Sequence, residues 1–462
     1  MTTKIADKGD TAFFGHPKAL GYLAFTEAWE RFSYYGMNTL LVLYMTRQLL
    51  LPGHVDNVVG FPFVRDLFDP GHTLSPQALA ALIGGTYGAL VYLTPLLGGL
   101  LADWVLGRTP TIIMGALLMA AGHFLMAFEQ PFFLALICLM LGSGCFKGNI
   151  ASQVGSLYKE GDNRRADAFQ VFYLGINAGV IAAPLVTGTL AENVAWHWGF
   201  GAAGVGMLIS IVIYMAGRKG FPSDPPLRKR AEMHVERPAM TRSDWIRVAM
   251  LFALVPVMAA SIVGNQQIFI VYQVWAQQSV DLHLFGKPML TEWLISVDSI
   301  VSVSCLAGMV IFWRLWAKRF KEPDEFGKII IGCAFGAAGV ACLGLGTILT
   351  PAGAKVPFFW LLLFHLLNDI GFANVLPVGL ALFARAAPQA ISGAVIGIYY
   401  LHLFIGNAFT GWLGSLLEKM PAADFWLMHA ALVGGAGVVF LVIAPFFRRV
   451  LAPEPQAALA AA

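Results

Sequence analysis

Long apolar segments alternate with short polar stretches along the whole 462-residue chain. A helix needs about 20 consecutive, mostly apolar residues to cross the hydrocarbon core of a bilayer. The pattern predicts twelve membrane-spanning helices, near residues 19–50, 77–102, 109–128, 131–157, 166–191, 197–216, 245–276, 291–316, 327–349, 357–385, 391–417 and 424–449. We therefore expect an all-α, multi-pass protein whose surroundings are the lipid bilayer.

The composition agrees with this pattern. Hydrophobic residues make up 58% of the chain and charged residues only 12%, which is about half the charged share of an ordinary soluble domain. We expect a plasma-membrane protein, in the inner membrane if the source is a bacterium. The five cysteines all fall inside apolar segments and lack metal-ligand spacing, so we interpret them as packing residues and expect no metal site.

Lysine and arginine are unevenly shared between the predicted loops, with a dense run at 218–242. Loops rich in these residues face the cytoplasm, which places both termini there. The basic run also divides the chain into a six-helix bundle at 1–217, a cytoplasmic linker at 218–243 and a second six-helix bundle at 244–462. Its charge fits anchoring at the membrane surface, so no nucleic-acid partner is expected.

The first predicted span carries three charges, Glu27, Glu30 and Arg31, at about the middle of the membrane. Charges at that depth are costly and mark a functional site. Together with Tyr34 they lie at offsets of three, four and seven residues, which places them on one face of a helix. The alternative is a self-neutralised ion pair that only holds helices together.

Lys147 places a second cation in the fourth predicted span, at a depth comparable with that of Glu30. A lone lysine there loses its charge or draws in water. We therefore expect it to pair with Glu27 or Glu30, so that two cations and two carboxylates line one cavity.

Residues 27–36 read E-A-W-E-R-F-S-Y-Y-G. This stretch resembles the first-helix signature E-x-x-E-R-F-x-Y-Y-G of the proton-dependent oligopeptide transporter family, which belongs to the major facilitator superfamily. The resemblance implies the major facilitator fold and a symporter that imports di- and tripeptides with protons by alternating access. It implies no cofactor beyond the proton, and we expect the chain to act as a monomer.

The resemblance also implies roles for single residues. Those expected to bind substrate in the first bundle are Arg31, Tyr34, Tyr35, Tyr92 in Y-L-T-P, Lys147 in G-S-G-C-F-K-G and Asn177 in F-Y-L-G-I-N. Those expected to couple the proton are Glu27, Glu30 and Lys147. Gly148 replaces a family proline after Lys147, and Gly85 stands where mammalian relatives carry a histidine. A buried Asn177 is equally explained by a bond to a neighbouring helix.

Three further residues are expected to serve the conformational cycle. Asp103 and Arg108 lie in G-G-L-L-A-D-W-V-L-G-R, which is similar to the loop motif of the superfamily. Pro377 lies where such transporters bend their cytoplasmic gate, since proline removes a backbone hydrogen bond and permits a kink. A static role in helix shape is the alternative for Pro377.

The second half departs from the family pattern at two acidic positions, which here hold Ala276 and Phe372. The acids that the predicted spans leave buried in this half are Asp298 and Asp369. We therefore expect one of them to bind the peptide amine, or each to make only a helix-packing hydrogen bond.

Other functions stay open on the sequence. The lost acids leave another small carboxylate-bearing solute open as the cargo. A sensor that binds peptides without moving them would be marked by a large regulatory domain, and none is visible. Neither H-E-x-x-H nor G-x-S-x-G occurs, so we expect no enzyme.

Overall fold

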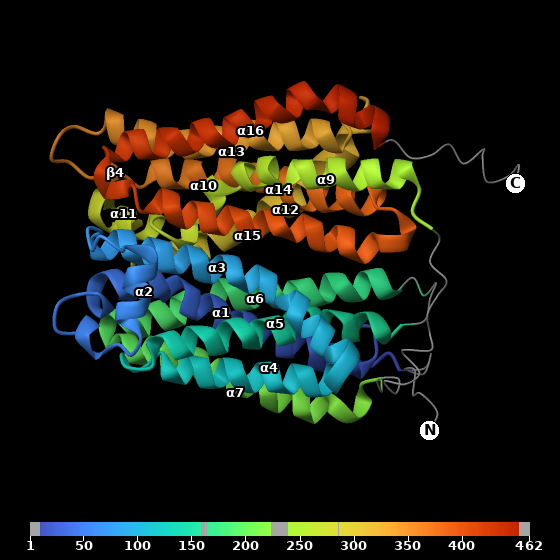
Figure 1. Ribbon diagram of the computed structural model, residues 1–462, viewed down its shortest axis with the longest axis horizontal. Helices are drawn as coiled ribbons and strands as arrows, with labels where there is room; N and C mark the ends of the chain where they lie inside the picture. The colour runs from blue at the N-terminus through green and yellow to red at the C-terminus, as the bar shows by residue number, and fades with distance from the viewer. Residues whose placement is uncertain (1–9, 159–161, 163, 223–238, 285, 452–462) are drawn as a thin grey trace, which may run out of the picture. The chain divides into compact units, whose positions relative to one another are not determined.

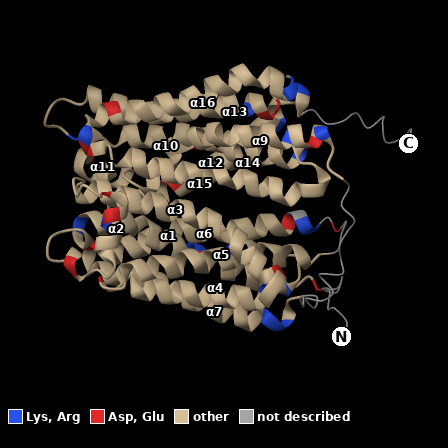
Figure 2. Cartoon of the chain, in the orientation of Figure 1, with Lys and Arg blue, Asp and Glu red and all other residues tan. Residues whose placement is uncertain are grey.

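The computed structural model describes residues 10–158, 162, 164–222, 239–284 and 286–451, and nearly all of them are helical (Figure 1). Ten of the described helices are long and apolar enough to cross a membrane. Lys, Arg, Asp and Glu gather at helix ends, and most of each helix is uncharged between them (Figure 2). The chain is therefore an integral, multi-pass membrane protein.

Contacts divide the chain into two compact units. The described part of the first unit comprises residues 10–222, 269–278 and 282–300, and that of the second comprises 239–268, 279–281 and 301–451. Most of the predicted linker, at 223–238, lies outside the described residues.

The first unit contains the helices α1 (Lys18–Tyr44), η1 (Met45–Leu49), η2 (Val55–Asn57), α2 (Phe61–Phe68), α3 (Pro76–Leu101), η3 (Ala102–Leu106), α4 (Arg108–Leu125), α5 (Phe132–Ser156), α6 (Arg164–Asn193), α7 (Trp196–Gly217) and η4 (Arg218–Gly220). It also contains most of α11 (Tyr272–Ser279), the antiparallel strands β2 (His283–Leu284) and β3 (Lys287–Pro288), and the first turns of α12 (Trp293–Trp316). η1 and η3 are π-helices that continue α1 and α3.

The second unit contains α9 (Arg242–Ser261), α10 (Val263–Gln266), the rest of α12, α13 (Glu325–Leu349), α14 (Phe359–Ala386), η6 (Gln389–Ile391), α15 (Ser392–Gly414), η7 (Leu417–Lys419) and α16 (Ala422–Val450). The 3₁₀ helix η5 (Gln267–Phe269) follows α10. Strands β1 (Val280–Asp281) and β4 (Val356–Pro357) pair in parallel, with Val280 opposite Val356.

Two predicted spans, which form α1 and α4, are not among the ten helices, and a third predicted span is interrupted. α1 is helical throughout but is not one of the ten, because Glu27, Glu30 and Arg31 lie at its centre. The predicted span at 245–276 is not one helix, since α9 ends at Ser261 and three short helices follow.

The break after Ser261 has a physical cause in the packing of the second unit. The side-chain amide of Gln267 donates to the Thr410 carbonyl at 3.1 Å and lies 2.9 Å from Nε2 of His429. A Cβ atom at Gly264 would lie 2.4 Å from a Val340 methyl group, so only glycine fits there. Irregular backbone at membrane depth is tolerated where protein covers and satisfies it, as these contacts do here.

Candidate functional site

Three charged side chains of α1 form one buried, ion-paired group. Arg31 donates from Nε to Oε1 of Glu27 at 2.8 Å, and its Nη2 lies 2.8 Å from the same oxygen. The Nε atom also lies 2.9 Å from Oε2 of Glu30. The side chains of Arg31, Glu27 and Glu30 are 12%, 3% and 0% exposed. The structure thus confirms that these residues gather on one face of α1.

Close contacts with α6 and α7 fix the rotation of α1 about its axis. On α6, a Cβ atom at Gly179 would lie 2.2 Å from the Ala28 carbonyl oxygen, so glycine is required for this approach. On α7, the Ser210 hydroxyl donates to the Thr26 carbonyl at 2.7 Å. The charged group therefore has a defined direction, because α1 cannot turn without breaking these contacts.

Lys147 extends from α5 to the same region of α1, where its Nζ lies 3.8 Å from the centroid of the Tyr34 ring. A desolvated cation–π contact of this kind is worth about 2 kcal/mol. Among the described residues Lys147 makes no ion pair with Glu27 or Glu30 in this structure, although both carboxylates lie within electrostatic reach of it. The reason is that Arg31, on the same helix, contacts both carboxylates.

Tight packing of α3 against α5 sets the position of Lys147. A Cβ atom at Gly144 would lie 2.6 Å from Cβ of Thr94, and the Thr94 hydroxyl donates to the Met140 carbonyl at 3.0 Å. Gly148, in place of the proline of the family motif, leaves α5 continuous from Phe132 to Ser156. Lys147 therefore lies within an unbroken helix.

Tyrosines surround this charged group. Tyr34 lies within electrostatic reach of Arg31, Tyr35, Tyr87 and Tyr92. The Tyr34 and Tyr35 rings meet edge to face with centroids 5.3 Å apart. The structure thus brings three predicted substrate-binding tyrosines to the charged group.

Tyr87 also lies beside this group, although the sequence patterns did not indicate it. Its hydroxyl is buried, has no hydrogen-bond partner in the described part of the chain, and lies within electrostatic reach of Glu30. Tyr87 and Tyr92 are five positions apart, a spacing that does not place them on one helix face. The available signal was chemical: a tyrosine hydroxyl inside an apolar span needs a polar neighbour.

The other predicted binding residues are placed less centrally. The side-chain amide of Asn177 donates to the Tyr173 carbonyl of its own helix at 2.8 Å, and not to the neighbouring helix that the alternative for it named. Asp298 belongs to the first unit, is buried, and lies within electrostatic reach of Tyr35. Asp369 is buried in α14 of the second unit, one helical turn after buried His365.

Asp103 and Arg108 flank a sharp change of direction. Asp103 lies in η3, and Arg108 begins α4 after Gly107, whose φ of +87° favours glycine. Just before η3, a Cβ atom at Gly98 would lie 2.1 Å from the Gly144 carbonyl oxygen. Gly98 of this motif therefore permits the close approach of α3 to α5.

Pro377 lies inside α14, which stays helical on both sides of it. The preceding carbonyl, that of Leu376, accepts a hydrogen bond from the Tyr399 hydroxyl of α15. The Tyr399 side chain is buried against His402. Pro377 thus weakens α14 at a point where α15 holds it.

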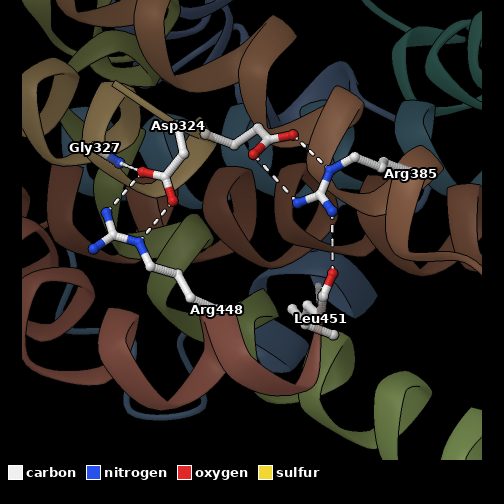
Figure 3. A network of polar contacts seen from close by, with 6 residues as sticks. Asp324, Gly327, Arg385, Arg448 and Leu451 are labelled. Atoms are coloured by element: carbon white, nitrogen blue, oxygen red, sulfur yellow. Dashed lines mark hydrogen bonds and ion pairs between the residues drawn. The ribbon is translucent and has the colours of Figure 1, made fainter. Parts of the chain in front are cut away.

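The end of α14 is tied to two other helices of the second unit (Figure 3). Arg385 donates to both carboxylate oxygens of Glu325 at 2.7 and 3.2 Å, and to the Leu451 carbonyl at 3.1 Å. Arg448 of α16 donates to both oxygens of Asp324 at 2.6 and 2.7 Å. These bidentate pairs join α13, α14 and α16 at one end of the unit.

The group around Arg31 combines fixed donors with protonatable acceptors. Two carboxylates and two cations make it neutral when all four are charged. The Nη1 atom of Arg31 donates no hydrogen bond to any described residue. Such a group can take up a proton on a carboxylate and bind an anion at the guanidinium.

The chain is similar to known peptide transporters over nearly its whole length. The sequence model described as POT family matches residues 109–237. The peptide transporter YePEPT of Yersinia enterocolitica is 30% identical, over 97% of this chain and 98% of that protein. A di-/tripeptide transporter of Lactococcus lactis is 28% identical, over 95% and 97%.

Solved structures give the same result. The crystal structure of a peptide transporter POT in complex with sulfate superposes with a TM-score of 0.81 and 27% identity, covering 95% of this chain and 96% of that chain.

Proposed function

The chain belongs to the POT family, and on this premise we propose that it is a proton-coupled symporter that imports di- and tripeptides by alternating access. The names of its relatives, a peptide transporter and a di-/tripeptide transporter, support this cargo. Proton coupling is the trait of the family, and the buried carboxylates of α1 supply groups on which a proton can bind.

We propose twelve membrane spans, made by the ten long apolar helices together with α1 and α4. The uneven distribution of Lys and Arg supports cytoplasmic termini. Two six-helix bundles, at 1–217 and 244–462, and a functional monomer complete the proposed organisation. No cofactor other than the proton takes part.

The observation that carries the proposal is the bonding of Arg31. Its guanidinium is held between Glu27 and Glu30, while its Nη1 donates to no described residue. A peptide carboxylate binds there through charge-assisted hydrogen bonds. Tyr34 lies within electrostatic reach of Arg31, Tyr35 and Tyr92, and we assign these three tyrosines to the contact with the peptide.

Proton and peptide favour the same state of this group. A proton on Glu27 or Glu30 removes one negative charge and frees part of the Arg31 donor set. The charged group then has an excess positive charge from Arg31 and Lys147, which attracts the peptide carboxylate. Because linkage is reciprocal, the bound peptide raises proton affinity by the same factor.

The peptide amine needs an acid, because a buried and unpaired ammonium costs several kcal/mol. Ala276 and Phe372 cannot supply one. We assign the amine to Asp298 or Asp369, both buried. Asp298 is the first choice because it lies within electrostatic reach of Tyr35. We also propose Asn177 as a substrate contact, in which its side-chain amide gives up the hydrogen bond to the Tyr173 carbonyl and donates to the peptide instead.

The conformational cycle is assigned to Asp103, Arg108 and Pro377. Asp103 and Arg108 bracket the turn that follows the Gly98 contact, so a movement of α3 against α5 changes their separation. Pro377 lets α14 bend beside Tyr399.

A second cargo is favoured by one observation. Ala276 is fully buried where the family pattern has an acid, so nothing at that position can bind an amine. A small solute with a carboxylate and no amine would satisfy Arg31 without needing the missing acid.

Competition in proteoliposomes separates these cargoes. Uptake of labelled dialanine, with the outside made acidic, is measured against unlabelled dialanine, dialanine amide, N-acetyl-dialanine and simple monocarboxylates. We expect dialanine to compete and the other compounds to compete poorly. If dialanine amide competed as well as dialanine, the assignment of Arg31 to the peptide carboxylate would be wrong. Equal competition by N-acetyl-dialanine or a monocarboxylate would favour the second cargo.

A further inference from the structure

A second charged group lies in the first unit, away from the α1 site. It consists of Arg47 in η1, Glu192 near the end of α6, and Glu292 immediately before α12. Arg47 forms an ion pair with Glu192 through Nη1, and its Nη2 donates to Oε2 of Glu192 at 3.3 Å. Nη1 lies 4.0 Å from Oε1 of Glu292. We call Glu192 and Glu292 the outer acid pair, and Arg47 is the arginine beside it.

The charges of this group do not balance without a proton. Arg47 is 35% exposed and bound to Glu192, which is 19% exposed, whereas the Glu292 side chain is fully buried. By hydrogen-bond geometry neither Glu292 oxygen accepts from another described residue, and the donor nearest to them is the backbone N–H of Glu292 itself. The charged groups that face it are Glu192 and Arg47. A buried carboxylate with one distant cation and a neighbouring carboxylate is strongly unfavourable.

The two carboxyl groups lie within hydrogen-bonding reach of each other. A hydrogen bond between two carboxyl groups requires a proton on one of them. Burial is the largest cause that raises the pKa of Glu292, to about 8, and the nearby Glu192 carboxylate adds to it. Glu292, the more buried of the two, is therefore the proton carrier.

Glu292 is also part of the contact that holds the start of α12 on α6. A Cβ atom at Gly188 would lie 2.4 Å from Cβ of Glu292, so α6 and the residue that precedes α12 are in direct contact at this point. The Trp293 indole donates to the Thr189 hydroxyl at 3.1 Å, and the Ser296 hydroxyl donates to the Ile181 carbonyl at 2.7 Å. A charged Glu292 would oppose this docking, because it would repel Glu192 and need water.

We propose that the outer acid pair Glu192–Glu292 is a second proton-binding site, and that a proton shared between them stabilises the docking of the first turns of α12 on α6. The proposal rests on the proposed function only for its orientation, in which this end of both helices faces outward. External acid would then favour the docked state independently of the proton bound at α1.

The sign of the pH dependence follows from linkage. Glu292 binds its proton more tightly when docked, with a pKa of about 8 against an ordinary value of 4.5 when exposed. Docking is therefore strongest in acid and weakens as pH rises between these values, by at most about tenfold in population per pH unit. Above the docked pKa no further change is expected.

Spin labels on the two docked segments measure this directly. Val194 and Lys287, both exposed, are replaced by cysteine in a background without the five native cysteines. The short-distance population between the labels, recorded from pH 5 to pH 9 without peptide, should fall as pH rises. Glu292→Gln, which mimics the protonated acid, should hold the short distance at every pH.

Two further variants secure the result. Glu192→Gln removes the repulsion and frees Arg47 for Glu292, so it should also flatten the pH dependence, and it serves if Glu292→Gln does not fold. Glu129→Gln is the matched control, an acid of the same unit bonded to Gln48, His54 and Asn57 instead, and it should behave as wild type.

A wild-type distance that does not change with pH would overturn the proposal. So would an undiminished pH dependence in Glu292→Gln or in Glu192→Gln. The experiment uses no substrate, so a failure of peptide transport leaves its outcome unaffected. Conversely, a failure of the outer acid pair leaves the proposed cargo intact.

Discussion

Replacing Arg31 by lysine keeps the positive charge and removes the planar guanidinium. The structure gives Arg31 three short contacts with acids: Nε and Nη2 each 2.8 Å from Glu27, and Nε 2.9 Å from Glu30. A single ammonium cannot contact both carboxylates and still donate to a substrate carboxylate. At least one charge-assisted hydrogen bond is lost, at about 2 kcal/mol. That predicts peptide affinity about 30-fold weaker.

The assay is counterflow of labelled dialanine in proteoliposomes at equal pH on both sides, which reports binding and exchange without a proton gradient. Half-inhibitory concentrations are compared for dialanine and dialanine amide. Arg31→Lys should weaken the free acid strongly and the amide little, because the amide has no carboxylate to lose. Arg65→Lys is the matched control, since Arg65 lies 3.9 Å from Asp69 and over the Phe61 ring, and neither residue belongs to the charged group on α1.

Binding of dialanine by Arg31→Lys within threefold of wild type would refute this reasoning. An equal loss for the free acid and the amide would refute it too, because the effect would then come from a damaged site rather than from the carboxylate contact.

Four other measurements follow from the structure, the last of them given at the end. If Asp298 or Asp369 binds the peptide amine, replacing that residue by asparagine should reduce the preference of the transporter for dialanine over N-acetyl-dialanine. An unchanged preference in both single variants and in the double variant would show that neither residue binds the amine. Gly98→Ala should lower the melting temperature in detergent by an amount equivalent to about 1–3 kcal/mol, since its Cβ would lie 2.1 Å from a carbonyl oxygen, whereas Gly99→Ala, with nothing within 4 Å, should not. Equal melting of the two variants would contradict the packing described. Tyr87→Phe should leave stability unchanged or raise it by about 1 kcal/mol, because a buried hydroxyl without a partner is removed; a clear loss of stability would show that the hydroxyl is bonded.

The helices were predictable because a long apolar segment in a bilayer must satisfy its own backbone hydrogen bonds, and an α-helix does so. The exception is the segment after Ser261, where apolar residues continue but the helix does not. Its break depends on Gln267 reaching Thr410 and His429, residues far away in the sequence. Hydrophobic pattern alone does not encode such contacts.

The part of the site that lies on one helix was predictable, because it depends only on the spacing of residues along that helix. Glu27, Glu30 and Arg31 share a face because of their spacing, and the structure confirms it. Both acids form their ion pairs with Arg31, and Lys147 lies within electrostatic reach of them without forming one. Depth along the helices matched Lys147 to Glu30, but depth does not show which cation is nearer to the acids. Arg31 is on the same helix, and the Tyr34 ring takes Lys147 instead.

The outer acid pair was invisible in the sequence for a related reason. Arg47, Glu192 and Glu292 each stand at the end of a predicted span, where a charged residue is ordinary. Only their meeting in the first unit makes the burial of Glu292 unusual.

The most direct test of the account is accumulation of dialanine by the Glu30→Gln variant in proteoliposomes that are acidic outside and negative inside. One proton moving through 100 mV supplies about 2.3 kcal/mol, enough for roughly forty-fold accumulation. Wild type should concentrate dialanine, and an uncoupler should abolish the gradient. Glu30→Gln should exchange dialanine across the membrane and fail to concentrate it. Accumulation by Glu30→Gln to the wild-type level would contradict the assignment of proton coupling to the charged group on α1.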